Sequence, residues 1–189
     1  MNNTFNIFMA GVGGQGIILA SDIVTQVAMN AGFDVKKSEI HGMSQRGGSV
    51  FSHIRFGNRV FSPVIPEKEA DIFLSLEQME TLRWLHLTNS NTQVIVYNTK
   101  ILPAEVKEYP VGIEEELKDK FRNLLLINPD TILQKIGAPK FINVALVGII
   151  SNYLSFSLDN WKDAINKEVP SGTFDDNWKA FLTGKDLYK

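Results

Sequence analysis

Blocks of hydrophobic and polar residues alternate along this chain and predict strands and helices in turn. Apolar runs that are typical of buried strands occur at 5–11, 70–76, 93–99 and 123–128. After the first run, apolar residues recur at helical spacing, at Ile17, Ala20, Ile23, Val24, Val27 and Ala31. Gly32 supplies the stop of this helix. The chain therefore opens with a strand, a glycine turn and a helix, which is the start of an α/β unit.

The middle of the chain predicts further strands. FDVKKSEI at 33–40 is the second strand, and SVFSHIRF at 49–56 alternates as a half-buried strand does. RVFSPVI at 59–65 alternates too, and Gly57–Asn58 between the two runs is a two-residue hairpin signal. The prolines at 63 and 66 place this last run at a sheet edge or cut it short.

Helices are predicted at 77–87, 114–121, 140–156 and 159–169, with Asp159 as the N-cap of the last one. Alternation of strands and helices with one hairpin predicts an α/β, Rossmann-like layered fold: a mixed β-sheet flanked by helices, with one inserted β-hairpin. We see no repeat, low-complexity tract or linker, so we expect one domain over 1–189.

Composition narrows the classes of function. Hydrophobic residues make up 44% and charged residues 21%, as in ordinary globular proteins, and the net charge of -2 argues against a nucleic-acid partner. The 189 residues include no cysteine, which excludes disulfides, thiolate zinc sites and cysteine-ligated iron–sulfur clusters in them. The three histidines show no metal-site spacing, so we assign no metal ligand.

The hydropathy of the chain predicts no membrane segment. The longest apolar run, VALVGII at 144–150, is too short to span a bilayer. No basic region leads into an apolar run at the start of the sequence, as a signal peptide would require. We therefore expect a cytoplasmic location.

The first glycine turn carries the clearest chemical signal. Gly11, Gly13 and Gly16 fit G-x-G-x-x-G, and Gly14 adds a fourth glycine. A strand precedes and a helix follows, so the free amides of that helix would face an anion. The other interpretation is that the glycines serve close packing alone. A nicotinamide site also needs an acid at the end of the second strand, where Glu39 is the sole candidate.

Lys36 and Lys37 precede that acid, and Gln15 is an unusual residue for a dinucleotide turn. These residues favour an anion-binding turn over a standard NAD site.

A second glycine loop, GMSQRGG, follows the second strand. We expect it to emerge at the same end of the sheet as the first turn, on an adjacent strand, so that both line one crevice. Its candidate binding residues are Ser44, Gln45, Arg46, Gly47 and Gly48. Arg46 offers a planar cation for phosphate or carboxylate, or alternatively contacts a partner subunit. His41 and His53 have structural interpretations, and we assign no catalytic residue.

These stretches together resemble a known protein family. GVGGQGIILAS, then SEIHGMSQRGGSVFSHIRFG and FSPVIPEKEADIFLSLE, resemble the gamma subunit or domain of 2-oxoacid:ferredoxin oxidoreductases. NVALVGIIS at 143–151 and the NWKAFLTG tail fit as well, so the resemblance covers most of the chain. The motif HGMSQRGG is most similar to that of the beta subunit of indolepyruvate ferredoxin oxidoreductase, which belongs to the same domain family.

The resemblance implies a domain III-like fold of pyruvate-ferredoxin oxidoreductase and a role in a multi-subunit enzyme. Such enzymes oxidatively decarboxylate a 2-oxoacid, form an acyl-CoA and pass electrons to ferredoxin. Thiamine diphosphate and iron–sulfur clusters would lie on partner subunits, and this chain would contribute coenzyme A handling and assembly. Gly11, Gly13, Gly14, Gln15 and Gly16 would form the first binding turn, and Ser44 to Gly48 the second.

Alternatives from other classes remain open. The chain could be a free-standing NAD(P)-linked reductase, which would act without a partner. It could instead be a structural interaction module in which the loops are interface turns. Under the leading hypothesis the isolated chain is inactive. The sequence leaves open whether the isolated chain forms a homodimer.

Overall fold

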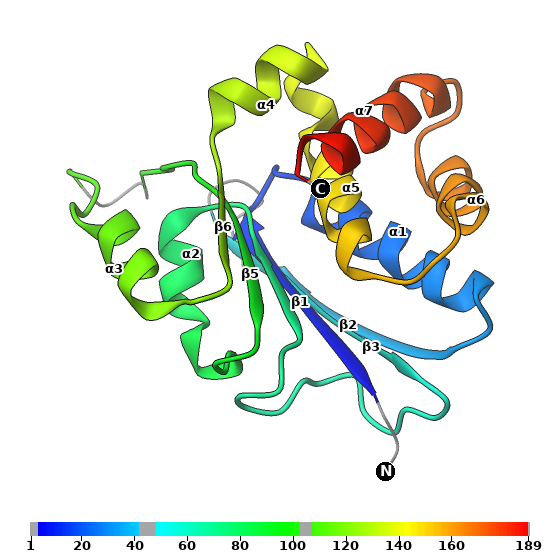
Figure 1. The fold of residues 1–189 in the computed structure, drawn as a ribbon, viewed down its shortest axis with the longest axis horizontal. Helices are drawn as coiled ribbons and strands as arrows, with labels where there is room; N and C mark the ends of the chain where they lie inside the picture. The colour runs from blue at the N-terminus through cyan, green and yellow to red at the C-terminus, as the bar shows by residue number, and fades with distance from the viewer. Residues whose placement is uncertain (1–3, 42–47, 103–106, 189) are drawn as a thin grey trace.

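The computed structural model describes residues 4–41, 48–102 and 107–188. Within them, strands form one sheet in the order β2-β3-β1-β4-β5-β6 (Figure 1). The strands are β1 (Phe5–Val12), β2 (Asp34–His41), β3 (Ser49–Gly57), β4 (Ile72–Ser75), β5 (Gln93–Tyr97) and β6 (Leu124–Ile127). The predicted mixed sheet flanked by helices is confirmed.

Strand directions define where a ligand would gather. β1, β4, β5 and β6 run parallel, whereas β3 runs antiparallel to both β1 and β2. The chain leaves β1 toward β2 and β3 on one side, and later continues to β4 on the other side. The carboxyl ends of β1 and β4 therefore form a topological switch point, which is the usual ligand position in open α/β sheets.

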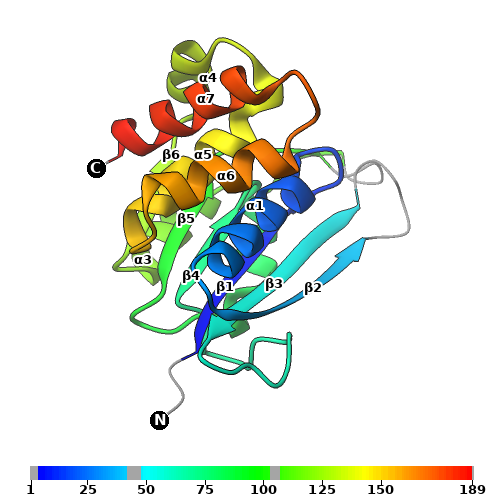
Figure 2. The same cartoon turned by 90° about the vertical axis from the view of Figure 1, so that its right-hand side faces the viewer.

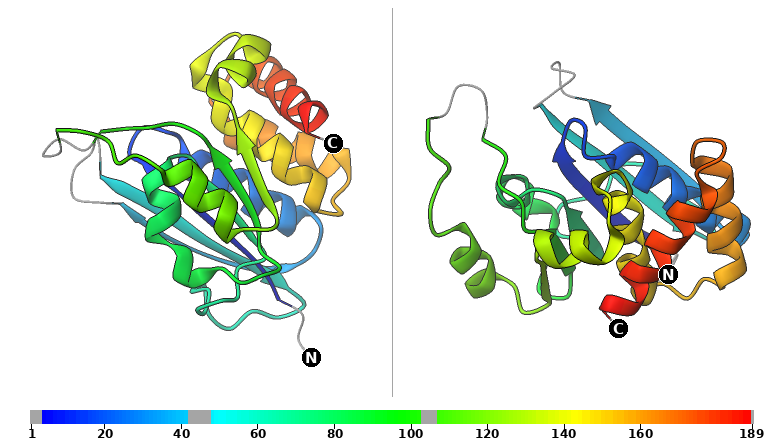
Figure 3. Two further views of the ribbon diagram at one scale, coloured as in Figure 1. Left: turned by 60° about the vertical axis from the view of Figure 1, so that its left-hand side comes forward. Right: turned by 90° about the horizontal axis from the view of Figure 1, so that it is seen from above.

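Helices cover both faces of the sheet (Figures 1 and 2). One face carries α1 (Ile17–Asn30), α4 (Pro129–Ile136), α5 (Ile142–Ile150), α6 (Leu158–Glu168) and α7 (Phe174–Leu187). The other face carries α2 (Gln78–Arg83) and α3 (Ile113–Lys120), as the turned views in Figure 3 make plain. Short 3-10 turns are η1 (Leu85–Leu87), η2 (Pro139–Phe141) and η3 (Ser151–Tyr153).

The first unit follows the local sequence pattern closely. Gly16 adopts φ 79° and begins α1, and the predicted apolar positions from Ile17 to Val27 are buried against the sheet. Gly32, with φ 85°, follows the end of α1, and its N–H donates a hydrogen bond to the Met29 carbonyl oxygen. Both glycines occupy the left-handed region that other residues rarely adopt, which explains where this helix begins and ends.

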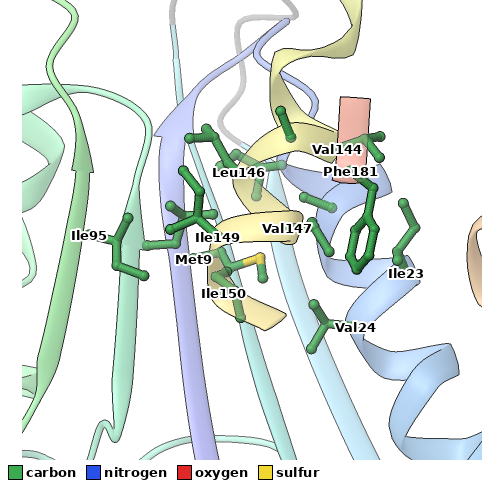
Figure 4. Packing of buried hydrophobic residues seen from close by; sticks show 14 of the residues in the cluster. Met9, Ile23, Val24, Ile95, Val144, Leu146, Val147, Ile149, Ile150 and Phe181 are labelled. Atoms are coloured by element: carbon green, nitrogen blue, oxygen red, sulfur yellow. The ribbon is translucent and has the colours of Figure 1, made fainter. Parts of the chain in front are cut away.

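Helix α5 is the centre of the larger core. All of its residues are buried, and it lies between the sheet and α7 (Figure 4). Ile149 packs toward Met9 and Ile95 of the sheet, while Phe181 of α7 lies on the other side of the helix.

Along the described chain, no single helix is both long and apolar enough to cross a membrane. The pair Pro129–Ile136 and Pro139–Tyr153 would satisfy those criteria jointly, with a bend of 100° between them.

The contact between α5 and α7 depends on two glycines. A Cβ on Gly148 would overlap the backbone carbonyl of Phe181, and one on Gly184 would overlap the carbonyl of Ala145. The two helices therefore touch backbone to backbone, which only a residue without a side chain permits.

The strand predicted at 59–65, as the partner of β3 in a hairpin, is wrong. Those residues form no strand, because β3 is already paired on both edges, with β1 and with β2. Arg55 instead holds the segment through the carbonyl oxygens of Ser62 and Val64, each at 3.1 Å. The hairpin of the sheet is formed by β2 and β3, so the turn signal at Gly57 lies outside it.

Two helix predictions need correction as well. Ser157, rather than Asp159, caps α6: its hydroxyl accepts a hydrogen bond from the Asn160 N–H at 3.2 Å. Helix α4 was not expected. Asn128 caps it by accepting from the Thr131 N–H at 3.0 Å, and Gly137 ends it. Ile132 is buried, and Leu133 and Ile136 pack partly buried against the core, so the helical spacing is present but extends over only eight residues.

Candidate functional site

The first glycine turn connects β1 to α1 at the switch point. Gly14 and Gly16 have φ of 99° and 79°, conformations that favour glycine. Gly11, near the end of β1, is in close contact with its surroundings, because a Cβ there would lie 2.8 Å from Gln15 Oε1 and 3.1 Å from Leu76 Cβ. The glycines thus serve both turn geometry and close packing.

Gln15 bridges the carboxyl ends of β1 and β4. Its Oε1 accepts from the Val12 N–H at 2.7 Å, and its Nε2 donates to the Leu76 carbonyl oxygen at 2.7 Å. The same Nε2 lies 3.4 Å from Thr99 Oγ1. A glutamine is suited to this place because its amide has both a donor and an acceptor. Its side chain therefore fixes the switch-point crevice and forms one wall of the adjoining cavity.

Asn143 of α5 holds the last glycine of the turn. Its Nδ2 donates to the Gly16 carbonyl oxygen at 3.2 Å, and the side chain is buried. A Cβ on Gly16 would lie 2.9 Å from Asn143 Cγ, so the glycine also makes room for the amide. The start of α1 is in this way attached to the start of α5.

The two glycine loops meet. The Gly13 N–H donates to the Gly48 carbonyl oxygen at 2.9 Å, which places the end of the second loop beside the first turn. Ser44, Gln45, Arg46 and Gly47 lie outside the described residues. The expectation that the loops leave adjacent strands is wrong, since β3 lies between β1 and β2. They still share one end of the sheet because β1 and β2 run in the same direction.

A cavity of about 300 Å³ adjoins the glycine turn. Its walls come from the turn, from the ends of β4 and β5, and from the segment that begins α5. The lining residues are Gly14, Gln15, Gly16, Leu76, Tyr97, Pro139, Lys140, Ile142 and Asn143. The cavity therefore lies beyond the carboxyl ends of parallel strands, where α/β proteins bind ligands.

The polar groups of this cavity favour negative charge. Lys140 lies at its wall, with Nζ 4.7 Å from the Phe141 ring centroid. Tyr97 is only 8% exposed, and burial, with a further contribution from the Asp130 charge, raises the pKa of its hydroxyl above the ordinary value. A tyrosine hydroxyl is protonated at neutral pH with or without this shift, so it can donate a hydrogen bond.

The histidines and the candidate ribose acid serve other purposes. His53 is buried in β3, where Nδ1 accepts from the Ile65 N–H at 3.3 Å. Burial, with help from the Arg55 and His86 charges, lowers the pKa of His53 to about 4. Glu39 forms an ion pair with Lys37 at 2.8 Å, which makes it a poor ribose ligand. Across the described parts of the chain, no acid, histidine and cysteine cluster could hold a metal.

A buried acid also organises the rim. Glu77 is 1% exposed and caps α2 by accepting from the Glu80 N–H at 3.0 Å. Its other oxygen accepts from the Ile101 N–H and from the Tyr109 hydroxyl. Burial and this contact raise the pKa of Tyr109 above its usual range. The segment after β5 is thereby attached to the carboxyl end of β4.

Sequence reasoning missed the contribution of Tyr97, Lys140 and Asn143. The signal was present in part, because Tyr97 lies near the end of a predicted strand and Lys140 begins a predicted helix. Their proximity to the glycine turn was not readable, since Gly16 and Asn143 are 127 positions apart.

Comparison with known proteins agrees with this architecture. Residues 6–187 match the pyruvate ferredoxin/flavodoxin oxidoreductase family. The indolepyruvate oxidoreductase subunit IorB of Archaeoglobus fulgidus is 39% identical over 187 residues, which cover 95% of this chain and 92% of that protein.

Solved structures share the fold. The gamma subunit of a keto/oxoacid ferredoxin oxidoreductase from Geobacter sulfurreducens superposes with a TM-score of 0.73 at 22% identity, covering 97% of this chain and 95% of that one. The 2-oxoglutarate:ferredoxin oxidoreductase of Magnetococcus marinus, with 2-oxoglutarate, coenzyme A and succinyl-CoA bound, gives 0.74 at 18% identity and covers 99% of this chain and 31% of that one. From the family match and the relative that is 39% identical along nearly its whole length, we conclude that this chain belongs to the pyruvate ferredoxin/flavodoxin oxidoreductase family.

Proposed function

We propose that this chain is the gamma-type subunit of a 2-oxoacid:ferredoxin oxidoreductase that acts on indolepyruvate or a related aryl pyruvate. The observation that carries the proposal is the 39% identity to an indolepyruvate oxidoreductase subunit over 95% of this chain. In the reaction the 2-oxoacid loses its carboxyl group as CO₂ and its carbonyl carbon forms a thioester with coenzyme A. The electron pair released passes to ferredoxin.

The chemical step belongs to a partner subunit in this proposal. That subunit would hold thiamine diphosphate, which stabilises the carbanion formed on decarboxylation, and the iron–sulfur clusters. The absence of cysteine from the 189 residues fits a subunit that carries no cysteine-ligated cluster. Ferredoxin would meet the complex rather than this chain alone, and the complex would work in the cytoplasm.

This chain would contribute coenzyme A handling and assembly. The proposed binding surface consists of Gly11, Gly13, Gly14, Gln15, Gly16, Ser44, Gln45, Arg46, Gly47 and Gly48. Support comes from the Gly13–Gly48 hydrogen bond, which joins the first turn to the last residue of the second loop, and from the amides at the start of α1. The Magnetococcus marinus relative, whose structure contains coenzyme A, adds further support.

Co-expression tests the proposal. The chain would be produced with the thiamine-binding, cluster-carrying subunit encoded beside it, and 2-oxoacid-dependent reduction of ferredoxin or a viologen dye would be measured with coenzyme A present. We expect turnover by the complex only, with indolepyruvate preferred over pyruvate and 2-oxoglutarate. Dye reduction or NAD(P)H turnover by this chain alone would contradict the proposal.

Arg46 is the sharpest probe of the second loop. Arg46→Ala in the complex should raise the KM for coenzyme A or weaken subunit affinity, since the second loop would lose its planar cation. Arg122→Ala, on the segment between α3 and β6, is a matched control. If both variants keep the KM and the assembly of the unchanged complex, the second loop has no part in binding.

A further inference from the structure

We propose that the outer edge of β2 is the surface through which two copies of this chain associate. The two β2 strands pair antiparallel, with Ser38 of each copy opposite Ser38 of the other, and the sheet continues from one copy into the next. The inference goes beyond the proposed reaction, because this association needs neither a 2-oxoacid nor coenzyme A.

The first observation is that β2 is a terminal strand of the sheet. It pairs with β3 along its whole length, and among the described residues no strand pairs with its other side. Figure 2 shows β2 at the margin of the sheet. Its edge is eight residues long. The backbone groups of such an edge can pair with a strand of another chain.

The hydrogen bonds of the sheet determine which residues of β2 face outward. Gly13 and Gly48 continue the register of β1 and β3, and the Gly13 N–H donates to the Gly48 oxygen. In an antiparallel pair such bonds recur at every second residue, so the even-numbered residues of β3 bond to β1 and the odd-numbered ones to β2. The latter lie opposite the even-numbered residues of β2. The backbone groups of the odd-numbered residues, including Lys37 and Glu39, therefore point to the outer edge.

Symmetry and charge select the register. A two-fold axis at the seam places one residue opposite its own copy. Only two registers pair nearly all of β2, one with Lys37 on the axis and one with Ser38 there. The first sets two lysines opposite each other, which is destabilising. The second sets Lys37 of each copy opposite Glu39 of the other, and these odd-numbered residues are the ones whose backbone groups are available to bond.

The edge carries no excess charge that would repel a second copy. Lysines on an edge strand commonly prevent pairing. Here the Lys36 ammonium lies 3.1 Å from Asp34, and that of Lys37 lies 2.5 Å from Asp22 and 2.8 Å from Glu39. Each ammonium group is therefore balanced by a carboxylate within the same copy.

Exposed apolar side chains border the same edge. Ile40 of β2 is 52% exposed, and in the proposed register it lies opposite Lys36 of the other copy, whose hydrocarbon stem can cover it. On α1, Ile18 and Met29 are exposed and lie one turn before and two turns after Asp22, which contacts β2. A second copy at this edge would remove apolar surface from water.

Analytical ultracentrifugation of the full chain at about 100 μM tests the inference. One strand pair is a small interface, so we expect a weak, concentration-dependent dimer with twice the 21.2 kDa mass of the chain. Lys37→Glu and Glu39→Lys should each raise its dissociation constant about tenfold or more, because each sets like charges opposite one another twice. Lys162→Glu, at an exposed lysine of α6, is the matched control and should change nothing. Circular dichroism verifies folding.

A mixture of the two variants is the decisive step. In a mixed pair the acid introduced at position 37 faces the base introduced at position 39, while the unchanged Glu39 faces the unchanged Lys37. The mixture should therefore associate about as strongly as the unchanged chain. Damage within one copy could not be repaired in this way, so the rescue separates pairing across the seam from a role inside the monomer.

Three results would overturn the inference: an unchanged chain that stays monomeric at this concentration, a dimer that neither charge reversal weakens, or folded variants whose mixture does not associate. If a variant does not fold, hydrogen exchange of the unchanged chain decides. The amides of Val35 and Lys37 should exchange more slowly at 100 μM than at 1 μM, and equal exchange would contradict the pairing. Protection that arises only on adding the thiamine-binding subunit would assign the edge to that subunit instead. None of these results touches the proposed enzyme role, which is decided by turnover of the complex.

Discussion

The backbone N–H of Gly13 donates a hydrogen bond to the carbonyl oxygen of Gly48 at 2.9 Å. This contact joins the turn after β1 to the loop before β3, which the sequence separates by the whole of α1 and β2. The last residue of the second loop, Gly48, is thereby placed beside the first turn.

Gly16→Ala should destabilise the chain by about 2 kcal/mol, because it combines left-handed strain with a clash against Asn143. Chemical denaturation gives the free energy of unfolding. Gly172→Ala is the matched control, since Gly172 has φ 78° but open space around its Cβ position. The control should lose about 1 kcal/mol. Equal losses in the two variants would show that the Asn143 contact is unimportant.

Gly184→Ala should lower the free energy of unfolding by about 3 kcal/mol, because the new methyl group overlaps the carbonyl of Ala145. Helix propensity alone predicts the opposite sign, a gain of about 1 kcal/mol. The sign of the measured change therefore decides between the two effects. Lys179→Ala, on the exposed face of α7, controls for substitution in that helix and should be nearly neutral.

Gln15→Leu should cost about 1 to 3 kcal/mol, because it leaves the Val12 N–H without its acceptor in a largely buried place. The Leu76 carbonyl keeps a second donor, Thr99 Oγ1 at 2.6 Å, so only one group is orphaned. The double variant Gln15→Leu, Thr99→Val should therefore lose more than the sum of the two single changes. Simple additivity in thermal or urea unfolding would contradict this shared role.

His53 predicts a pH dependence of stability. Its pKa is lowered from 6.5 to about 4 in the fold, so the unfolded chain binds more protons between those values. The stability that neutral His53 contributes is complete above pH 6.5 and is lost as the pH falls toward 4. His53→Gln keeps an acceptor for the Ile65 N–H and should flatten this slope. An identical slope in both proteins would assign it to other groups.

Local patterns predicted much of the fold, and contacts between distant segments account for what they missed. The strand, turn and helix over 5–30 were readable because the apolar positions and the glycines lie within one short stretch. The misplaced hairpin shows the limit: nothing in 59–65 reveals that both edges of β3 are already occupied. Helix α4 was missed because its helical spacing, at Ile132, Leu133 and Ile136, covers a segment of only eight residues.

The candidate site also has parts that the sequence predicted and parts that it did not. The glycine turn was readable from spacing, and the meeting of the loops followed from strand direction, although β3 intervenes. The cavity was not readable, since the order of the sheet brings Tyr97 to the turn and the packing of α5 brings Lys140 there. The role of Gln15 was also hidden, because its partner Leu76 lies 61 positions further along.

The backbone contact between α5 and α7 has a practical meaning for anyone who handles this protein. A tag, a label or a truncation that disturbs the contact between Gly184 and Ala145 would displace Ala145. Ala145 lies one helical turn from the residues of α5 that line the cavity. A change after α7 can therefore alter a ligand-binding measurement without touching the cavity itself. The start of the chain is the safer place for a fusion, because β1 begins far from the contact between α5 and α7.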